Sequence, residues 1–331
     1  LMSAQRFPDD FDGIIAGAPV LDFTNTQIGG VWFARAMREN PLGLEKIARV
    51  GEAIYAACDG LDGLEDGLID DPRQCRFDPR TDYPRCEGAD RVDCLTEGQS
   101  ETLAKIYGGV VSRGEPYFPG QPLGAELGDP LGSPASRTSG WGRWFVDPAG
   151  GTPLLELFGV TFMRYMAFTR DDPDWSLERF DFDEDPYRMD AIRGILDATD
   201  PDLTRFRDAG GRMITYHGWS DTALNPMMAL NYYEDVLAET PDAADFYRLY
   251  MVPGMFHCAG GRGINTIDAL PDLVAWVENG EAPDRLVGRR VDQDGQVMMT
   301  RPVCPYPEVA RYTGSGDVAD ADSFVCRAPS S

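Results

Sequence analysis

Apolar, β-branched runs alternate with helix-period stretches in the chain and predict a parallel sheet. "FDGIIAGAPV" (11–20) is an apolar run that closes with Gly-Ala-Pro, which is typical of a buried strand. "RMITYHGWSD" (212–221) and "FYRLYMVPGM" (246–255) have the same character, and the stretch between them, 225–240, has helical periodicity. The order strand, helix, strand favours parallel pairing, and a further amphipathic helix is expected over 266–280.

The amino-acid composition changes in the middle part of the chain. Between residues 50 and 200 Asp, Gly and Pro are dense, and aromatic residues gather in runs such as "FMRYMAF" (162–168). We therefore expect an α/β fold interrupted by an insertion with a core of its own. The predicted division is a first part of the α/β core over 1–48, an inserted domain over 49–200 and a second part of the core over 201–331.

Composition narrows the classes of function. Thirty basic residues against fifty-five acidic ones give a net charge of −25 and a pI near 4.3. Such a charge repels phosphate backbones and anionic lipid surfaces, so we expect neither nucleic-acid nor membrane binding. No window approaches the run of about 20 apolar residues that a spanning helix needs.

Six of the seven cysteines fall into local couples that bracket short loops: Cys58 with Cys75, Cys86 with Cys94, and Cys304 with Cys326, which leaves Cys258 alone. Without C-x-x-C spacing or neighbouring histidines, these couples favour disulfides over zinc. Disulfides indicate an oxidising compartment, so the protein is expected to be secreted or periplasmic.

Two residues at predicted strand ends carry candidate chemistry. Asp221 and His257 each follow a buried strand, and the carboxyl ends of parallel strands share one rim, so the two side chains are expected to meet. Acid before histidine is the chain order of an α/β-hydrolase triad, although a single Asp or His at a strand end is more often structural. No G-x-S-x-G pentapeptide occurs in the sequence. A metal-dependent hydrolase built on His217, His257 and aspartates is disfavoured, because no H-x-x-x-H pair or third histidine is present.

An acidic turn forms a second candidate site. Asp59, Asp62 and Asp66 alternate with glycines in "CDGLDGLEDGLID", which gathers hard oxygens on a tight loop and suits calcium. The loop does not follow the EF-hand pattern. From spacing alone, a solvated acidic turn is about as plausible as a metal site.

Five blocks together resemble the tannase and feruloyl esterase family: "LMSAQRFPDDFDGIIAGAPV" (1–20), "CDGLDGLEDGLIDDPRQCRFDP" (58–79), "CLTEGQ" (94–99), "YHGWSDTALNP" (216–226) and "DFYRLYMVPGMFHCAGG" (245–261). The resemblance covers nearly the whole chain. It implies an α/β-hydrolase fold whose inserted domain is a lid, and hydrolysis of aromatic esters, of the phenolic or hydroxycinnamic type, by a Ser-Asp-His mechanism.

The resemblance also implies roles for individual residues. Asp221 corresponds to the triad acid and His257 to the general base, while the family's nucleophile lies in a Gly-Cys-Ser-x-Gly-Gly-Arg segment that would precede Leu1. The fold is accordingly expected to be incomplete at its N-terminus, and residues 1–331 alone are expected to be inactive. Cys258 matches a family cysteine that bonds to the cysteine beside the serine, which would explain its lack of a couple.

A structural calcium ion in the lid is implied in the same way. By position its ligands would be the carboxylates of Asp59, Asp62 and Asp66 and the backbone carbonyls of Leu64 and Leu68. The expected partner is a small aromatic ester. The alternative is a non-catalytic, calcium-stabilised binding protein of the same fold.

Overall fold

The computed structural model describes residues 1–329, which form two compact units. The first unit comprises residues 1–21, 58–74 and the described chain from 198 onward; the second comprises 22–57 and 75–197.

These bounds differ from the predicted division at residues 48 and 200. Helix α2 (Phe23–Glu39) belongs to the second unit, because Ile28 and Val31 on its buried face pack into that unit's core. The acidic segment 58–74 belongs to the first unit and not, as expected, to the insertion.

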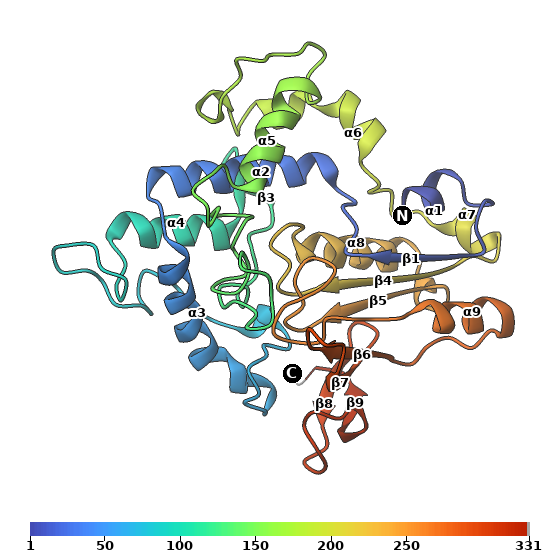
Figure 1. Cartoon of the computed structure of the whole chain (residues 1–331). Coiled ribbons are helices and arrows are strands. Elements are labelled where there is room, and N and C mark those ends of the chain that lie inside the picture. The colour runs from blue at the N-terminus through green and yellow to red at the C-terminus, as the bar shows by residue number, and fades with distance from the viewer. Residues whose placement is uncertain (330–331) are drawn as a thin grey trace. The chain divides into compact units, whose positions relative to one another are not determined.

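A three-stranded parallel sheet organises the first unit. Strand β4 (Arg212–Gly218) lies between β1 (Gly13–Gly17) and β5 (Tyr247–Val252), and all neighbours run parallel. Figure 1 shows the three strands side by side. The strands fall within the three predicted apolar runs, so the prediction of a parallel sheet is confirmed.

Both faces of this sheet are buried, which explains why its strands are nearly continuous apolar runs. Met213 and Leu249 pack on one face with helix α8 (Pro226–Glu239), whereas Ile214 and Tyr250 pack on the other with helix α9 (Leu270–Asn279). Both helices lie within the ranges predicted for them. Helix α9 ends at Gly280, whose φ of +75° is the left-handed conformation that glycine adopts readily.

Short elements complete the first unit. Two antiparallel pairs follow α9, and the disulfide between Cys304 and Cys326 joins the segment after β7 to β9. The remaining elements of this unit are α1 (Met2–Arg6), α7 (Thr204–Asp208), β6 (Leu286–Val291), β7 (Val297–Val303), β8 (Val309–Tyr312) and β9 (Phe324–Arg327), with 3-10 turns at Asp59–Asp62, Pro72–Gln74, Ala243–Asp245 and Ala321–Ser323.

The second unit is mainly helical around an aromatic core. Trp175, Phe162 and Phe180 are buried there together with residues of α2. Its other elements are α3 (Leu44–Cys58, whose last residue falls in the first unit), α4 (Glu97–Gly108), α5 (Leu154–Tyr165), α6 (Asp190–Leu196), the antiparallel pair β2 (Val110–Ser112) and β3 (Glu115–Phe118), and 3-10 turns at Leu177–Arg179 and Asp185–Arg188.

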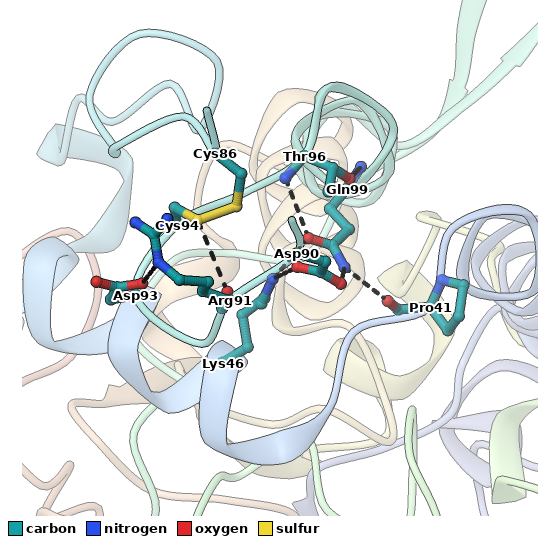
Figure 2. Close-up of polar contacts among 9 residues, drawn as sticks. All are labelled: Pro41, Lys46, Cys86, Asp90, Arg91, Asp93, Cys94, Thr96 and Gln99. Atoms are coloured by element: carbon teal, nitrogen blue, oxygen red, sulfur yellow. Dashed lines mark hydrogen bonds and ion pairs between the residues drawn. A yellow bond between two sulfur atoms is a disulfide. The ribbon is translucent and has the colours of Figure 1, made fainter. Parts of the chain in front are cut away.

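A polar cluster around the buried Lys46 fixes one loop of the second unit (Figure 2). Lys46, one of only two lysines in the chain, is buried on α3 and pairs with Asp90 and with Gln99 of α4. The loop that carries Asp90 is closed by the disulfide between Cys86 and Cys94. A buried charge is tolerated when it is paired and hydrogen-bonded, as here.

Cys58 and Cys75 are also disulfide-bonded, whereas Cys258 is a free cysteine. Within residues 1–329 no helix combines the length and the apolar character needed to cross a membrane.

Candidate active site

The turn after β4 holds the candidate acid. Asp221 is fully buried, and its Oδ1 accepts hydrogen bonds from the backbone N–H groups of Ala223 and Leu224, each at 2.9 Å. Asn225 then begins α8, where its side chain caps the N–H of Met227. The carboxylate is therefore held by its own turn, which the helix start anchors in place.

The loop after β5 brings His257 to this carboxylate. His257 Nδ1 lies 2.9 Å from Asp221 Oδ2, and the imidazole is one-third exposed. The two loops are also joined through their backbones, because Ser220 N–H donates to the carbonyl of Met255 at 3.1 Å and Trp219 N–H donates to that of Val252 at 2.9 Å. The structure thus brings together the two residues that the sequence predicted to meet.

The electrostatics suit an acid–base pair. Burial acts to raise the pKa of Asp221, but hydrogen bonds from His217 and His257 outweigh it and the pKa is lowered, so the acid stays ionised. The hydrogen bond to Asp221 raises the pKa of His257, against the opposing effect of burial. An ionised acid behind a histidine of raised proton affinity is the arrangement that supports general-base catalysis.

Cys258 adjoins the pair. Its Sγ lies 3.8 Å from His257 Nδ1 and 4.0 Å from the carbonyl oxygen of Gly17 at the end of β1. The residue is exposed and has a φ of +60°, an uncommon conformation for a residue other than glycine. Desolvation of the sulfur, with the charge of Asp221 adding to it, raises the pKa of the thiol. The expected bond from Cys258 to an upstream cysteine stays a prediction.

Residues 59–70, named here the acidic loop, lie in the first unit, and two of their aspartate side chains accept hydrogen bonds from backbone N–H groups of the same loop. Asp59 accepts hydrogen bonds from Gly67 N–H and Leu68 N–H, and Asp62 accepts one from Leu64 N–H at 2.9 Å. The third predicted ligand is Asp66, whose Oδ2 accepts a hydrogen bond from Arg301 at 2.7 Å. Its Oδ1 is buried and has no hydrogen-bond partner among the described residues.

The acidic loop also packs against the segment that carries the candidate base. Arg262 donates from Nε to the carbonyl of Gly67 at 3.3 Å. Leu68 is buried, and its Cδ2 would lie 2.8 Å from a Cβ added at Gly254, whose φ is +66°. A side chain at Gly254 would therefore meet both strain and a collision, and the close approach requires glycine. The acidic loop therefore contacts the segment of His257 on both sides of that residue, at Gly254 and at Arg262.

The sequence analysis did not predict the contact of His217 with Asp221, nor the part of Asp70 in the acidic loop. His217, near the end of β4, lies 3.3 Å from Asp221 Oδ2. Its position four residues before Asp221, at the end of the same predicted strand, could have indicated this contact, but the sequence analysis considered it only as a metal ligand. Asp70 extends the acidic spacing by four residues. Burial, together with the charges of Asp62 and Asp66, raises the pKa of Asp70 well above its usual range.

The chain belongs to the tannase and feruloyl esterase family, because the model of "Tannase and feruloyl esterase" matches residues 1–327. Among curated relatives it is 35% identical over 373 residues to the mono(2-hydroxyethyl) terephthalate hydrolase of Piscinibacter sakaiensis, covering 99% of this chain and 62% of that protein. It is 29% identical over 355 residues to feruloyl esterase B of Aspergillus niger, covering 97% of this chain and 62% of that protein. The chain thus spans about 62% of the length of these relatives.

Solved structures agree with the mixed α/β architecture. The crystal structure of feruloyl esterase B from Aspergillus oryzae matches with a TM-score of 0.84 at 26% identity, covering 98% of this chain and 65% of that one. Tannin acyl hydrolase from Aspergillus niger matches with a TM-score of 0.77 at 22% identity, covering 99% and 62%, which supports the fold alone.

Proposed function

We propose that the protein hydrolyses carboxylic esters of aromatic acids by a Ser-Asp-His mechanism, with Asp221 as the acid and His257 as the general base. The observation that carries the proposal is the 2.9 Å contact between His257 Nδ1 and the buried carboxylate of Asp221. Membership of the tannase and feruloyl esterase family supports the reaction class.

The contact assigns each ring nitrogen of His257 a part in the reaction. Nδ1 carries a proton that it donates to Asp221, so Nε2 is the nitrogen that accepts the proton of a serine hydroxyl as that hydroxyl attacks the ester carbonyl. The same nitrogen returns the proton to the leaving alcohol, and water then releases the acid in a second cycle of the same transfers. Asp221 stabilises the imidazolium that forms in each cycle.

The nucleophile is the part that these residues do not supply. Since no G-x-S-x-G occurs in the sequence, the mechanism requires a serine from elsewhere in the protein, which we propose to be the serine of the family's Gly-Cys-Ser segment. Cys258 would then bond to the cysteine beside that serine. By this proposal residues 1–331 alone are inactive.

The aromatic character of the substrate is proposed from the relatives, which include a terephthalate monoester hydrolase and feruloyl esterases. The second unit, proposed here as the lid, contains a pocket of about 350 Å³, lined by Phe33, Trp144, Phe145 and Leu155 with the Arg38–Glu156 ion pair beside them. A pocket of this size and lining can hold a single aromatic ring.

A structural calcium ion in the acidic loop is also proposed, held by Asp59, Asp62 and Asp66 and by the carbonyls of Leu64 and Leu68. No three Cys, His, Asp or Glu side chains within residues 1–329 are gathered closely enough to hold a metal as they stand. The donor chemistry nonetheless fits, because the unpartnered Oδ1 of Asp66 is a hard oxygen ligand of the kind that calcium prefers. The ion would stabilise the loop and take no part in the ester chemistry.

The compartment is proposed from the cysteines. Six of them are disulfide-bonded, and structural disulfides persist in oxidising surroundings, so a secreted or periplasmic enzyme is favoured.

The direct test of the function compares the full-length protein with its His257→Gln variant on methyl ferulate, methyl gallate and a terephthalate monoester. Loss of hydrolysis by about 10³-fold or more is expected when the base is removed. The variant Asp284→Asn serves as the control and should keep the wild-type rate, since the side chain of Asp284 is fully exposed and its contact with Arg248 is as long as 3.7 Å. Activity that survives His257→Gln would refute the assigned mechanism. A folded full-length protein that hydrolyses none of these esters would favour the non-catalytic binding protein.

A further inference from the structure

His217 occupies a buried position at the centre of the first unit. It lies next to the last residue of β4, the middle strand of the parallel sheet, and pairs in register with Met251 of β5. Its side chain has no exposed surface. A fully buried imidazole is costly unless its polar atoms are engaged, so its contacts indicate what it is there to do.

Only one ring nitrogen of His217 makes polar contacts in the described structure. Nε2 lies 3.0 Å from the carbonyl oxygen of Leu224 and 3.3 Å from Asp221 Oδ2. Both of these atoms are acceptors, since a carbonyl cannot donate and Asp221 is ionised, so the proton of the ring belongs on Nε2. Nδ1 is buried and has no hydrogen-bond partner within residues 1–329, which leaves a proton there without an acceptor.

The acceptors of His217 belong to the turn that forms the acid. Leu224 donates its N–H to Asp221 Oδ1 and offers its carbonyl to His217, so the imidazole closes a ring of contacts around the carboxylate. Oδ2 faces two histidines, His217 from the strand and His257 from the neighbouring loop. The carboxylate thus has donors on both oxygens and cannot rotate without losing some of them.

We infer that His217 is a positioning residue: by donating from Nε2 to the Asp221–Leu224 turn it fixes the orientation of the triad acid for His257. The inference rests on the proposed function for its catalytic meaning. His217 does not touch the reacting atoms. It acts through Asp221, whose ionised form it stabilises and whose Oδ2 it aims at His257 Nδ1.

The competing explanation is that His217 only satisfies the carbonyl of Leu224 inside the core. The two explanations differ in what a substitution changes. Substitution of a residue that only packs in the core changes the free energy of unfolding. Substitution of a positioning residue also lowers kcat, because the hydrogen bond between His257 and Asp221 is then less well aligned in the transition state. Its effect on KM is small in either case, since it lies away from the substrate.

The test uses two variants of His217 and one control in the full-length protein. His217→Gln keeps an N–H donor close to the place of Nε2, whereas His217→Phe keeps a ring but removes the donor. We expect His217→Phe to lower kcat by about 10- to 100-fold with KM within about twofold, and His217→Gln to recover most of the loss. The control is Thr215→Val, a change to a buried polar residue on the same face of β4, which should leave kcat unchanged.

The pH profile adds a readout that loss of stability does not move. Without the hydrogen bond from His217, the carboxylate of Asp221 is less stabilised and interacts more strongly with the protonated imidazole of His257, which raises the pKa of His257. The acidic limb of the kcat/KM profile should therefore shift to higher pH in His217→Phe and not in Thr215→Val. The titratable groups that face the Asp221–His257 pair are His217 and Cys258, and the proposed bond of Cys258 to the upstream cysteine leaves no thiol to titrate in the full-length protein. Equal kcat and equal limbs for wild type and a folded His217→Phe would overturn the inference.

Nitrogen NMR of the ¹⁵N-histidine-labelled wild-type protein tests the inference without any need for turnover. Residues 1–331 contain only two histidines, and each is assigned by the resonances that disappear in a folded single variant, His217→Gln or His257→Gln. The expected result is a proton on Nε2 of His217 and on Nδ1 of His257, and a proton on Nδ1 of His217 would overturn the inference whatever kcat the variants show. If no ester is hydrolysed, the proposed function fails, while a changed His257 Nδ1–H resonance in His217→Phe still supports the positioning role.

Discussion

Replacement of Asp221 by Asn tests the acid–base pair most sharply, because the change keeps the shape of the side chain. Asp221 accepts two backbone N–H groups on Oδ1 and faces two imidazoles on Oδ2. The amide oxygen of Asn can keep the two backbone bonds, and its NH₂ group then takes the place of Oδ2. This group can only donate, so His257 must turn an unprotonated Nδ1 toward it and carry its proton on Nε2.

The consequence is a base with its proton on the wrong nitrogen. A histidine protonated on Nε2 cannot accept the proton of serine, and we expect kcat to fall by roughly 10⁴-fold, which corresponds to about 5 kcal/mol of lost transition-state stabilisation. Stability should change less, by about 1–3 kcal/mol, because hydrogen bonds to a charged group are lost while the turn remains. The assay is stopped-flow or steady-state hydrolysis of a chromogenic aromatic ester at several pH values, with urea unfolding in parallel. A folded Asp221→Asn protein that keeps kcat within tenfold of wild type would refute the reasoning.

Other predictions follow from the same contacts. Leu68→Ala should lower the free energy of unfolding by about 2–5 kcal/mol, because it removes a buried side chain between the acidic loop and the segment of Gly254. An unchanged urea midpoint would contradict this prediction. Calcium added to EDTA-treated protein should raise Tm, whereas magnesium should raise it less; identical curves would count against a calcium site in the acidic loop. The double change of Cys86 and Cys94 to Ala should cost about 2–3 kcal/mol from loop entropy, measured by urea unfolding, and no loss would mean that the polar cluster alone holds the loop. Since the hydrogen bond to Asp221 raises the pKa of His257, activity should fall on acidification through a pKa above that of an ordinary histidine, and a limb at or below the ordinary value would contradict the contact.

The sheet could be predicted from sequence because its strands are buried on both faces. Residues 11–20, 212–221 and 246–255 are mainly apolar, and this pattern can be recognised in each segment by itself. The short antiparallel pairs near the C-terminus gave no comparable signal, because β8 and β9 have only four residues each and are partly exposed.

The division into units could not be read from composition. The amino-acid composition changes near residue 50, but the second unit already begins at residue 22, just before α2. The buried face of α2 does not reveal from sequence which of the two cores it packs against. The return of segment 58–74 to the first unit depends on long-range contacts, such as that of Arg301 with Asp66, which leave no local pattern.

The contact between Asp221 and His257 could be predicted because the topology of the sheet alone decides it. Asp221 and His257 follow parallel strands, so their meeting required only the direction of the sheet. The part that His217 plays depends on the exact path of the turn from Asp221 to Leu224, which brings a carbonyl and a carboxylate to one nitrogen. Sequence periodicity does not encode such a path.

The measurement that tests the central claim most directly is labelling of the full-length protein with a fluorophosphonate, followed by peptide mapping. The account predicts one labelled serine, flanked by a cysteine that is bonded to Cys258, and loss of labelling in His257→Gln and Asp221→Asn. Ester hydrolysis by a protein that takes up no label, or label at a serine within residues 1–331 with Cys258 still a free thiol, would contradict it.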